Sequence, residues 1–114
     1  MTKLKDFYGK VLLEIDNGKV KEFAGLVKYI LDGNVVKDFY GKILYRIDGE
    51  NIKDFYGTIL LRFDGCKLKK FSGEVIYLYE NNKIKQYSGQ IIYQIDGFLT
   101  RNELMGLLAL LFAS

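Results

Sequence analysis

Short apolar segments alternate with glycine, asparagine and aspartate along almost the whole chain. The stretch IKDFYGTILLRFDG at 52–65 shows the pattern, and near-copies occur at 36–49 and 68–81. Each apolar segment spans about six residues and is rich in Val, Ile, Leu, Tyr and Phe, which is the composition of β-strands. The pattern therefore predicts short strands separated by tight turns.

The pattern recurs every 16 residues without an insertion or a linker. Three kinds of residue mark this period: a glycine (Gly9, Gly25, Gly41, Gly57, Gly73, Gly89), an acid (Asp16, Asp32, Asp48, Asp64, Glu80, Asp96) and an aromatic residue (Phe7, Phe23, Phe39, Phe55, Phe71, Tyr87). Six tandem units run over 3–98, with two segments in each. The repeat predicts twelve strands in one domain, 1–114.

Each unit contains two turn signals. The first is a glycine followed by a mostly polar residue, such as Gly57-Thr58, and suits a two-residue hairpin turn with a positive φ. The DFYG pattern also fits a type I turn with Asp first and Gly last, which would shift the register. The second signal varies from Asn17-Gly18 to Asn81-Asn82, again residues that tolerate a positive φ.

Residues that flank the second turn match in kind, which favours antiparallel pairing. Asp16 would face Lys19 and Ile15 would face Val20. By the same rule Asp64 would face Lys67, Phe63 would face Leu68 and Glu80 would face Lys83. The alternative is a two-sided β-solenoid capped by the helix, which would stack equivalent lysines at roughly 4.8 Å, where like charges repel. We therefore expect an antiparallel meander.

The repeat stops at Leu99, and the segment 99–114 predicts an apolar helix. Thr100 and Glu103 form a capping box, and Leu99 with Leu104 fits a hydrophobic staple. The following LMGLLALLFA is apolar on every side, so the helix has to be surrounded. It is too short to cross a bilayer, for which roughly 20 residues are needed.

A twelve-stranded meander closed into a barrel would enclose this helix. Such a barrel has a radius on the order of 11–13 Å, which suits one helix about 10–12 Å across. Gly106 would let the helix approach one side of the wall. The inner wall would come from Val11, Leu13 and Ile15 and from equivalents such as Ile43, Tyr45, Ile47, Ile91, Tyr93 and Ile95.

This topology resembles the tubby and phospholipid-scramblase architecture, a twelve-stranded barrel around a hydrophobic C-terminal helix. The units YGKILYRIDG and the ending IDGFLTRNELMGLLALLFAS are similar to small bacterial proteins that combine hairpin repeats with an apolar C-terminal helix. That second resemblance spans nearly the whole chain and implies no activity.

Strict alternation would put the Phe row outside, opposite the inner Ile residues. This row consists of Phe7, Phe23, Phe39, Phe55 and Phe71. A second row, Leu12, Leu44, Leu60, Ile76 and Ile92, would lie on the same face. Either a bulge near Lys53-Asp54 turns the Phe row inward, or the exposed rows form an interface with another copy.

Catalytic chemistry has little support in the sequence. With no His and the single cysteine Cys66, neither a His-based triad nor a His or Cys metal site can be built. The recurring acids read as turn residues beside lysines, so we expect no enzyme, no metal and no cofactor. The Met1 end shows no secretory pattern, which together with the lone cysteine favours the cytoplasm.

A basic row recurs on the predicted sheet and is the candidate for contact with anionic surfaces: Lys21, Lys37, Lys53, Lys69 and Lys85, with Lys5 as the equivalent in the first unit. Tyr8, Tyr40 and Tyr56 neighbour this row, but the formal charge is only +3 and acids interrupt the row at Asp6, Glu22, Asp38 and Asp54, so nucleic acid is an unlikely partner. The resemblance to the tubby and scramblase barrel would imply anionic lipid headgroups as the ligand. The favoured interpretation is a structural or protein-interaction module, self-association included. A binder of anionic surfaces is the alternative.

Overall fold

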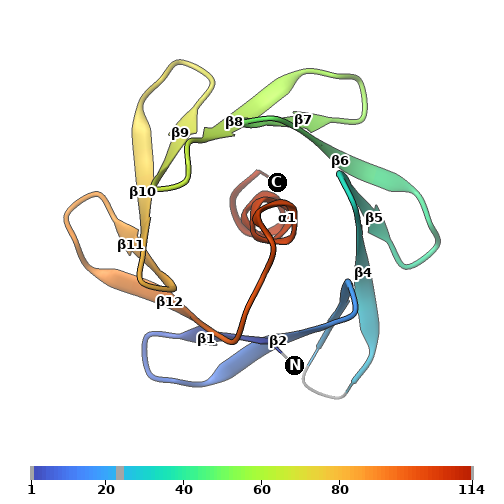
Figure 1. The fold of residues 1–114 in the computed structure, drawn as a ribbon, viewed down its shortest axis with the longest axis horizontal. Helices are drawn as coiled ribbons and strands as arrows, with labels where there is room; N and C mark the ends of the chain where they lie inside the picture. Colours follow the sequence, from blue (N-terminus) through green and yellow to red (C-terminus); the bar gives the residue numbers. More distant parts are fainter. Residues whose placement is uncertain (1, 23–24, 114) are drawn as a thin grey trace.

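Twelve antiparallel strands close into a barrel around one helix in the computed structural model, which describes residues 2–22 and 25–113 (Figure 1). The strands are β1 Thr2–Asp6, β2 Val11–Asp16, β3 Lys19–Lys21, β4 Val27–Asp32, β5 Val35–Asp38, β6 Ile43–Asp48, β7 Asn51–Asp54, β8 Ile59–Phe63, β9 Lys67–Lys70, β10 Val75–Glu80, β11 Lys83–Gln86 and β12 Ile91–Asp96. The helix is α1, Arg101–Phe112.

Each strand pairs with its neighbours in sequence, and β1 pairs with β12 to close the ring. The meander is therefore confirmed, and the solenoid alternative is wrong. The predicted register is also confirmed, because Ile15 pairs with Val20 and Asp16 with Lys19. Closure leaves the sheet without an edge among the described strands, so no row of backbone donors stays unpaired along one.

A β-bulge occurs in each of the six hairpins that turn at a repeat glycine, which we call the Gly-turn hairpins. In β7–β8, Ile52 pairs with Leu61 but Lys53 pairs with Ile59, which leaves Leu60 as the extra residue. Leu60 packs against the core. Ile59 pairs with Lys53 and therefore lies on the same face of the sheet as that lysine. The expectation that Val11, Ile43 and Ile91 line the inner wall is therefore wrong, because these residues pair with Lys5, Lys37 and Lys85.

These bulges do not turn the Phe row inward. The extra residue lies on the strand after the glycine, whereas the Phe residue lies in the turn before the glycine. Phe7, Phe39, Phe55 and Phe71 stay 52–64% exposed. Phe23 lies outside the described residues. The Phe row is therefore exposed at these four residues, and an interface with another copy stays a prediction. The expectation that Leu60, Ile76 and Ile92 share the outer face is wrong, because these residues pack against the core.

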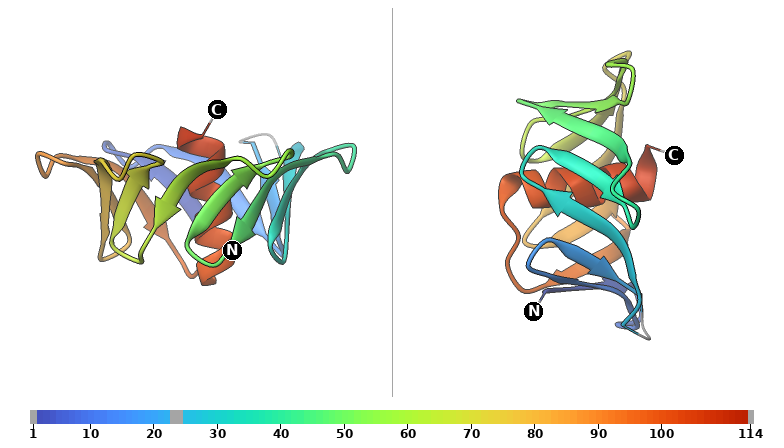
Figure 2. Two further views of the ribbon diagram at one scale, coloured as in Figure 1. Left: turned by 90° about the horizontal axis from the view of Figure 1, so that it is seen from above. Right: turned by 90° about the vertical axis from the view of Figure 1, so that its right-hand side faces the viewer.

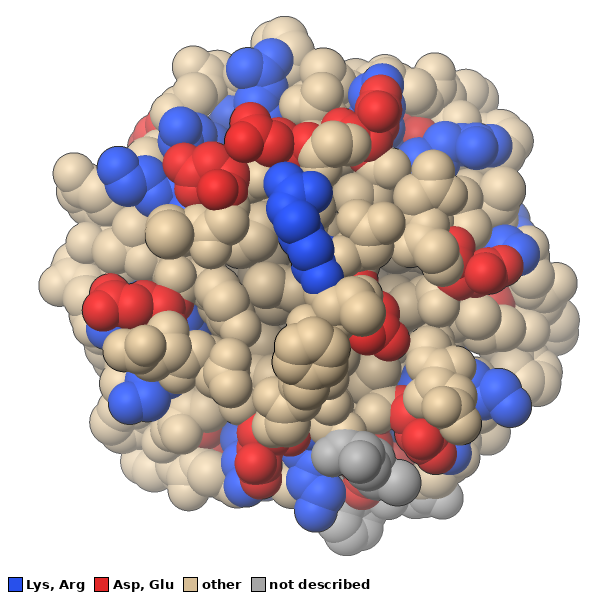
Figure 3. Space-filling view, viewed as in Figure 1, with Lys and Arg blue, Asp and Glu red and all other residues tan. Residues whose placement is uncertain are grey.

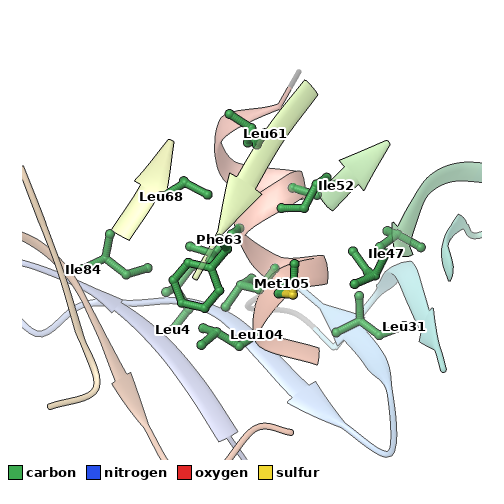
Figure 4. Packing of buried hydrophobic residues seen from close by; sticks show 14 of the residues in the cluster. Leu4, Leu31, Ile47, Ile52, Leu61, Phe63, Leu68, Ile84, Leu104 and Met105 are labelled. Atoms are coloured by element: carbon green, nitrogen blue, oxygen red, sulfur yellow. The ribbon is translucent and has the colours of Figure 1, made fainter. Parts of the chain in front are cut away.

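The helix is enclosed as the sequence predicts. Thr100 Oγ1 accepts a hydrogen bond from the Glu103 N–H at 3.2 Å, and Glu103 Oε1 accepts one from the Thr100 N–H at 2.9 Å, which completes the capping box. Residues 104–109 are buried on all sides, because wall residues such as Leu4, Ile52 and Phe63 converge on them (Figure 4).

The helix does not pack equally on all sides. A Cβ built on Gly106 would lie 2.9 Å from Leu31 Cδ2 and 3.1 Å from Val36 Cγ2, so the backbone of α1 lies directly against this part of the wall. At its C-terminal end Phe112 reaches another part of the wall and stacks on Tyr77, with ring centroids 4.1 Å apart. Glycine permits the first contact and an aromatic ring makes the second.

The barrel is a broad, shallow disc of 36 × 35 × 20 Å whose two ends differ (Figure 2). The Gly-turn hairpins lean outward at the end where α1 finishes, and we call this end the flared rim. The other end holds the second turns and the start of α1. Among the described residues, α1 included, no helix is long and apolar enough to span a membrane.

We expect Leu107→Ala to lower the free energy of unfolding by about 2–5 kcal/mol, because Leu107 is 0% exposed and its loss would leave a cavity between helix and wall. Denaturant unfolding followed by circular dichroism measures the change. Leu110→Ala, at a half-buried position of the same helix, is the matched control and should cost less. Equal, small effects of both substitutions would contradict an enclosed helix.

Candidate functional site

Exposed apolar side chains are concentrated on the flared rim. Nine of the ten large apolar residues that are exposed among the described residues belong to the Gly-turn hairpins: Phe7, Tyr8, Leu26, Phe39, Tyr40, Phe55, Tyr56, Phe71 and Tyr87. The tenth, Phe98, lies on the loop that leads into α1 at the opposite end. A concentration of this kind on one face marks an interaction surface more often than scattered apolar residues do.

Turn geometry explains why these side chains point outward. In the β7–β8 hairpin the Gly57 N–H donates to the Asp54 carbonyl at 3.1 Å, and Gly57 has φ +89°. The turn is therefore Asp54 to Gly57, with Phe55 and Tyr56 at its two central positions. The predicted two-residue turn at Gly57-Thr58 is wrong, and the DFYG turn is confirmed.

The first residue of three of these turns holds the loop in place. Asp54 Oδ1 accepts hydrogen bonds from the N–H groups of Tyr56 and Thr58, both at 2.9 Å. Asp6 and Asp38 make the same pair of bonds in their hairpins. In these three turns the Phe and Tyr rings meet edge to face, with centroids 5.3–5.4 Å apart. The three Phe–Tyr tips are thus ordered projections.

Four hollows lie between neighbouring Gly-turn hairpins. The two larger ones flank Phe112: the Tyr87 hollow, of about 750 Å³, lies between β9–β10 and β11–β12, and the Tyr93 hollow, of about 520 Å³, lies between β11–β12 and β1–β2. The Tyr29 hollow, of about 390 Å³, lies between β3–β4 and β5–β6, and the Leu44 hollow, of about 370 Å³, lies between β5–β6 and β7–β8. Aromatic and aliphatic side chains line all four.

Charges on the flared rim nearly cancel. Its acids are Asp6, Glu22, Asp38, Asp54 and Glu74, and its lysines are Lys10, Lys28, Lys42 and Lys70. Lys28 lies 3.6 Å from Glu22, and Lys70 lies 3.4 Å from Glu74. The rim therefore presents apolar tips with mixed charges and no excess of positive charge.

The lysine row lies on the outer wall rather than on the flared rim. Each candidate lysine pairs diagonally with an acid across the second turn: Lys21–Asp16, Lys37–Asp32, Lys53–Asp48, Lys69–Asp64 and Lys85–Glu80, at 2.7–3.8 Å. Lys5 pairs with Asp96 at 3.0 Å and completes the ring across the β1–β12 seam. The lysine side chains are 24–34% exposed. Because each lysine lies beside a carboxylate, its positive charge is already balanced by that acid. Anion binding by this row stays a prediction.

The end of the barrel where α1 begins is polar at its margin. Acidic and basic residues are distributed around the edge of this face (Figure 3). Arg101 reaches across it and donates from Nη1 to the Gly49 carbonyl at 3.0 Å. A hydrogen bond from Lys53, followed by its positive charge, lowers the pKa of Asp48. The two ends of the disc therefore differ in polarity.

Groups suited to catalysis are not brought together in the part of the chain that the structure describes. No cluster of three or more His, Cys, Asp or Glu residues there could hold a metal ion. Cys66 is exposed in a second turn. Burial, and then the neighbouring Tyr29, raise the pKa of Tyr45, so this phenol stays neutral at ordinary pH. Among the described residues, the flared rim carries nine of the ten exposed large apolar side chains and is the candidate functional surface.

Comparisons with known proteins add no further candidate. No family model matches the chain, and neither the curated proteins nor the solved structures contain a match. The site therefore has to be judged on its own geometry.

We expect Asp54→Ala to destabilise the fold by about 1 kcal/mol, because the N–H groups of Tyr56 and Thr58 would lose their acceptor. Gln86 occupies the equivalent position in the last unit, so Gln86→Asp is the matched reciprocal change and should be neutral or stabilising. Thermal unfolding of both variants measures the two effects. A destabilising Gln86→Asp with a neutral Asp54→Ala would contradict this account of the turn.

We expect stability to fall on acidification below about pH 4. Lysine contacts lower the pKa of Asp48 and Asp96 from 3.8 in the folded state. Their contribution is therefore present above pH 3.8 and is lost as the pH falls through the folded pKa values. Denaturant midpoints between pH 6 and about pH 2.5 measure the loss, which high salt should reduce. A midpoint that rises on acidification would contradict the assignment.

Proposed function

We propose that the protein is a non-enzymatic interaction module whose binding surface is the flared rim and whose partner is a second copy of the chain. The observation that supports this most is the gathering of nine exposed large apolar side chains on that rim. The half-buried end of α1, Leu110 to Ala113, opens onto the same surface. Covering this surface would remove apolar area from water, which favours association.

The charge of the rim supports a second copy over an anionic membrane. Five acids and four lysines give the rim no positive field to attract lipid headgroups. Two such faces carry almost no net charge, so they can approach each other without repulsion. Arg and Lys clusters, which direct proteins to phosphates, are missing from the described part of this surface.

The size of the rim also fits a dimer. A disc 36 × 35 Å across offers a face of roughly 1,000 Å², and a stable interface uses about 800 Å² per partner. The exposed residues are mainly Phe and Tyr, which are enriched at the centres of protein interfaces. Area and composition thus favour a specific contact.

Contact with anionic surfaces through the lysine row is the alternative function. The row consists of Lys21, Lys37, Lys53, Lys69 and Lys85, and each of these lysines lies beside an acid. An anionic lipid or nucleic acid would have to displace these carboxylates. For this reason we place the lysine row second to the flared rim.

We expect the wild-type chain to form dimers in a concentration-dependent way, and the variant Phe39→Ser/Tyr40→Ser/Phe55→Ser/Tyr56→Ser to stay monomeric, with a Kd raised at least about 100-fold. Light scattering and sedimentation over a concentration series measure this. Phe98→Ser is the matched control, because Phe98 is 80% exposed at the opposite end. Circular dichroism verifies that all variants fold.

A wild-type chain that stays monomeric at millimolar concentration would contradict self-association. Binding of the monomer to lipid vesicles, lost in the four-residue variant, would assign the rim to a membrane surface instead. A dimer that forms equally well in the four-residue variant would place the interface elsewhere on the barrel.

A further inference from the structure

We infer that two copies join flared rim to flared rim about a two-fold axis, with the hairpin tips of each copy seated in the hollows of the other. The inference rests on the proposed function and specifies how the partner is held. It comes from the unequal distribution of tips and hollows around an otherwise regular ring.

The ring geometry permits interlocking. Six Gly-turn hairpins follow one another around the barrel (Figure 1), and hollows lie between four neighbouring pairs of them. A two-fold axis perpendicular to the barrel axis reverses the order of the hairpins in the second copy. If the axis is placed so that the hairpins of the two copies alternate around the ring, each hairpin tip of one copy faces the space between two hairpins of the other. Such a contact is isologous and closed, so it stops at two copies.

The six hairpins and the spaces between them are not equivalent. Their differences select which tip of one copy meets which hollow of the other, and this choice is the register of the dimer. The Phe–Tyr tips of β5–β6 and β7–β8 are adjacent, and on the far side of the ring the two larger hollows are adjacent, on either side of β11–β12. Reversing the order brings the β5–β6 tip to the Tyr93 hollow and the β7–β8 tip to the Tyr87 hollow. Two of the three Phe–Tyr tips thus meet the two larger hollows.

The same operation fills the two smaller hollows. It brings the β1–β2 tip, with Phe7 and Tyr8, to the Tyr29 hollow of the second copy, and it brings Tyr87 on β11–β12 to the Leu44 hollow. All three Phe–Tyr tips and all four hollows are then used. Each contact occurs twice, as two-fold symmetry requires.

Each tip carries acidic and neutral or basic residues together, so charge does not select the register. In the β5–β6 tip, Asp38 lies beside Lys42. Reversing the hairpin order turns the Asp38 side of this tip toward Asp6, which lines the Tyr93 hollow, and the Lys42 side toward Gln90. The fit of tips to hollows therefore carries the choice of register.

The end of the helix supplies the floor of both large contacts. Phe112 lines the Tyr87 hollow and the Tyr93 hollow and stacks on Tyr77. An incoming Phe–Tyr tip would cover this stack and the adjoining Leu111. The dimer would then seal the open mouth of the barrel, where α1 is only half buried.

One other two-fold arrangement also fills the four hollows, and it predicts different neighbours. In it the β1–β2 tip enters the Tyr87 hollow and Tyr87 enters the Tyr93 hollow, so one large hollow receives a single ring. The axis of our arrangement passes beside the β9–β10 hairpin and brings Ser72 of both copies together. The axis of the other passes beside β11–β12 and brings Ser88 of both copies together.

Cross-linking of single cysteines distinguishes these arrangements. In a Cys66→Ser background, Ser72→Cys and Ser88→Cys place one thiol at equivalent, exposed positions of neighbouring repeats. Neither change removes a Phe–Tyr tip. We expect a short bismaleimide to link Ser72→Cys into a covalent dimer at least about tenfold faster than Ser88→Cys, at a protein concentration where light scattering shows dimers.

The outcomes separate this inference from the proposed function. Faster linking of Ser88→Cys, or equal slow linking of both variants that still form dimers, would overturn the interlocked register and leave self-association intact. Ser72→Cys can also be introduced into the four-residue tip variant. If that protein forms no dimer in light scattering but still cross-links at the same rate, the link does not report the interlocked dimer, and the register is overturned. A wild-type chain that shows no dimer in light scattering would overturn both.

Discussion

Enclosure of an apolar helix by a ring of strands is the constraint on which the structure depends. The helix α1 has no polar face, so it cannot lie on a surface, and a twelve-stranded ring has too wide a lumen to fill with its own side chains. Each element supplies what the other lacks. Leu107 and Met105 are 0% exposed because wall residues from both halves of the ring reach them. Enclosure also gives the disc two different ends, since the helix begins at the end that holds the second turns and finishes at the flared rim.

Local turn chemistry then decides what the outside looks like. In three Gly-turn hairpins the bulge lets the extra residue, Leu60, Ile76 or Ile92, pack against the core. The Asp-to-Gly turn places two aromatic residues where the chain reverses, too far out to touch the helix. A residue type normally associated with a core is thus held at the surface by the backbone. The rim can therefore expose aromatic side chains while hydrogen bonds hold turns such as Asp54 to Gly57 in place.

Much of this fold could be predicted from the sequence, because a strict repeat makes each local signal count six times. Strand number, the pairing of Ile15 with Val20, the capping box at Thr100 and the enclosed helix all follow from residue patterns. The bulge position could not be derived, since alternation gives no signal for one extra residue such as Leu60. The choice between two turn registers at Gly57 was open, and it depended on whether the Asp54 carboxylate closes the loop.

The candidate site was harder to predict because it arises from departures from the repeat. The sequence favoured a protein-interaction surface and gave the lysine row as the alternative, and that row is paired with acids on the wall. The two larger hollows are both lined by Phe112, which belongs to the helix and not to the repeat. A residue in the tail therefore shapes a surface built by residues far away in sequence. Only the exposed Phe row gave a hint of the rim in advance.

The closing seam has a consequence for how the chain acquires its structure. Eleven of the strand pairings join neighbours in sequence, but β1 and β12 meet across almost the full length, with Thr2 Oγ1 donating to the Phe98 carbonyl at 2.7 Å. The helix follows β12, so it is synthesised after all twelve strands. Hairpins can form early as local units, yet the ring has neither its enclosed helix nor its closing strand pair until β12 and α1 have been synthesised. Until then the sheet is open and exposes its apolar face and two unpaired edge strands. Whether it closes before it aggregates depends on how quickly β1 pairs with β12.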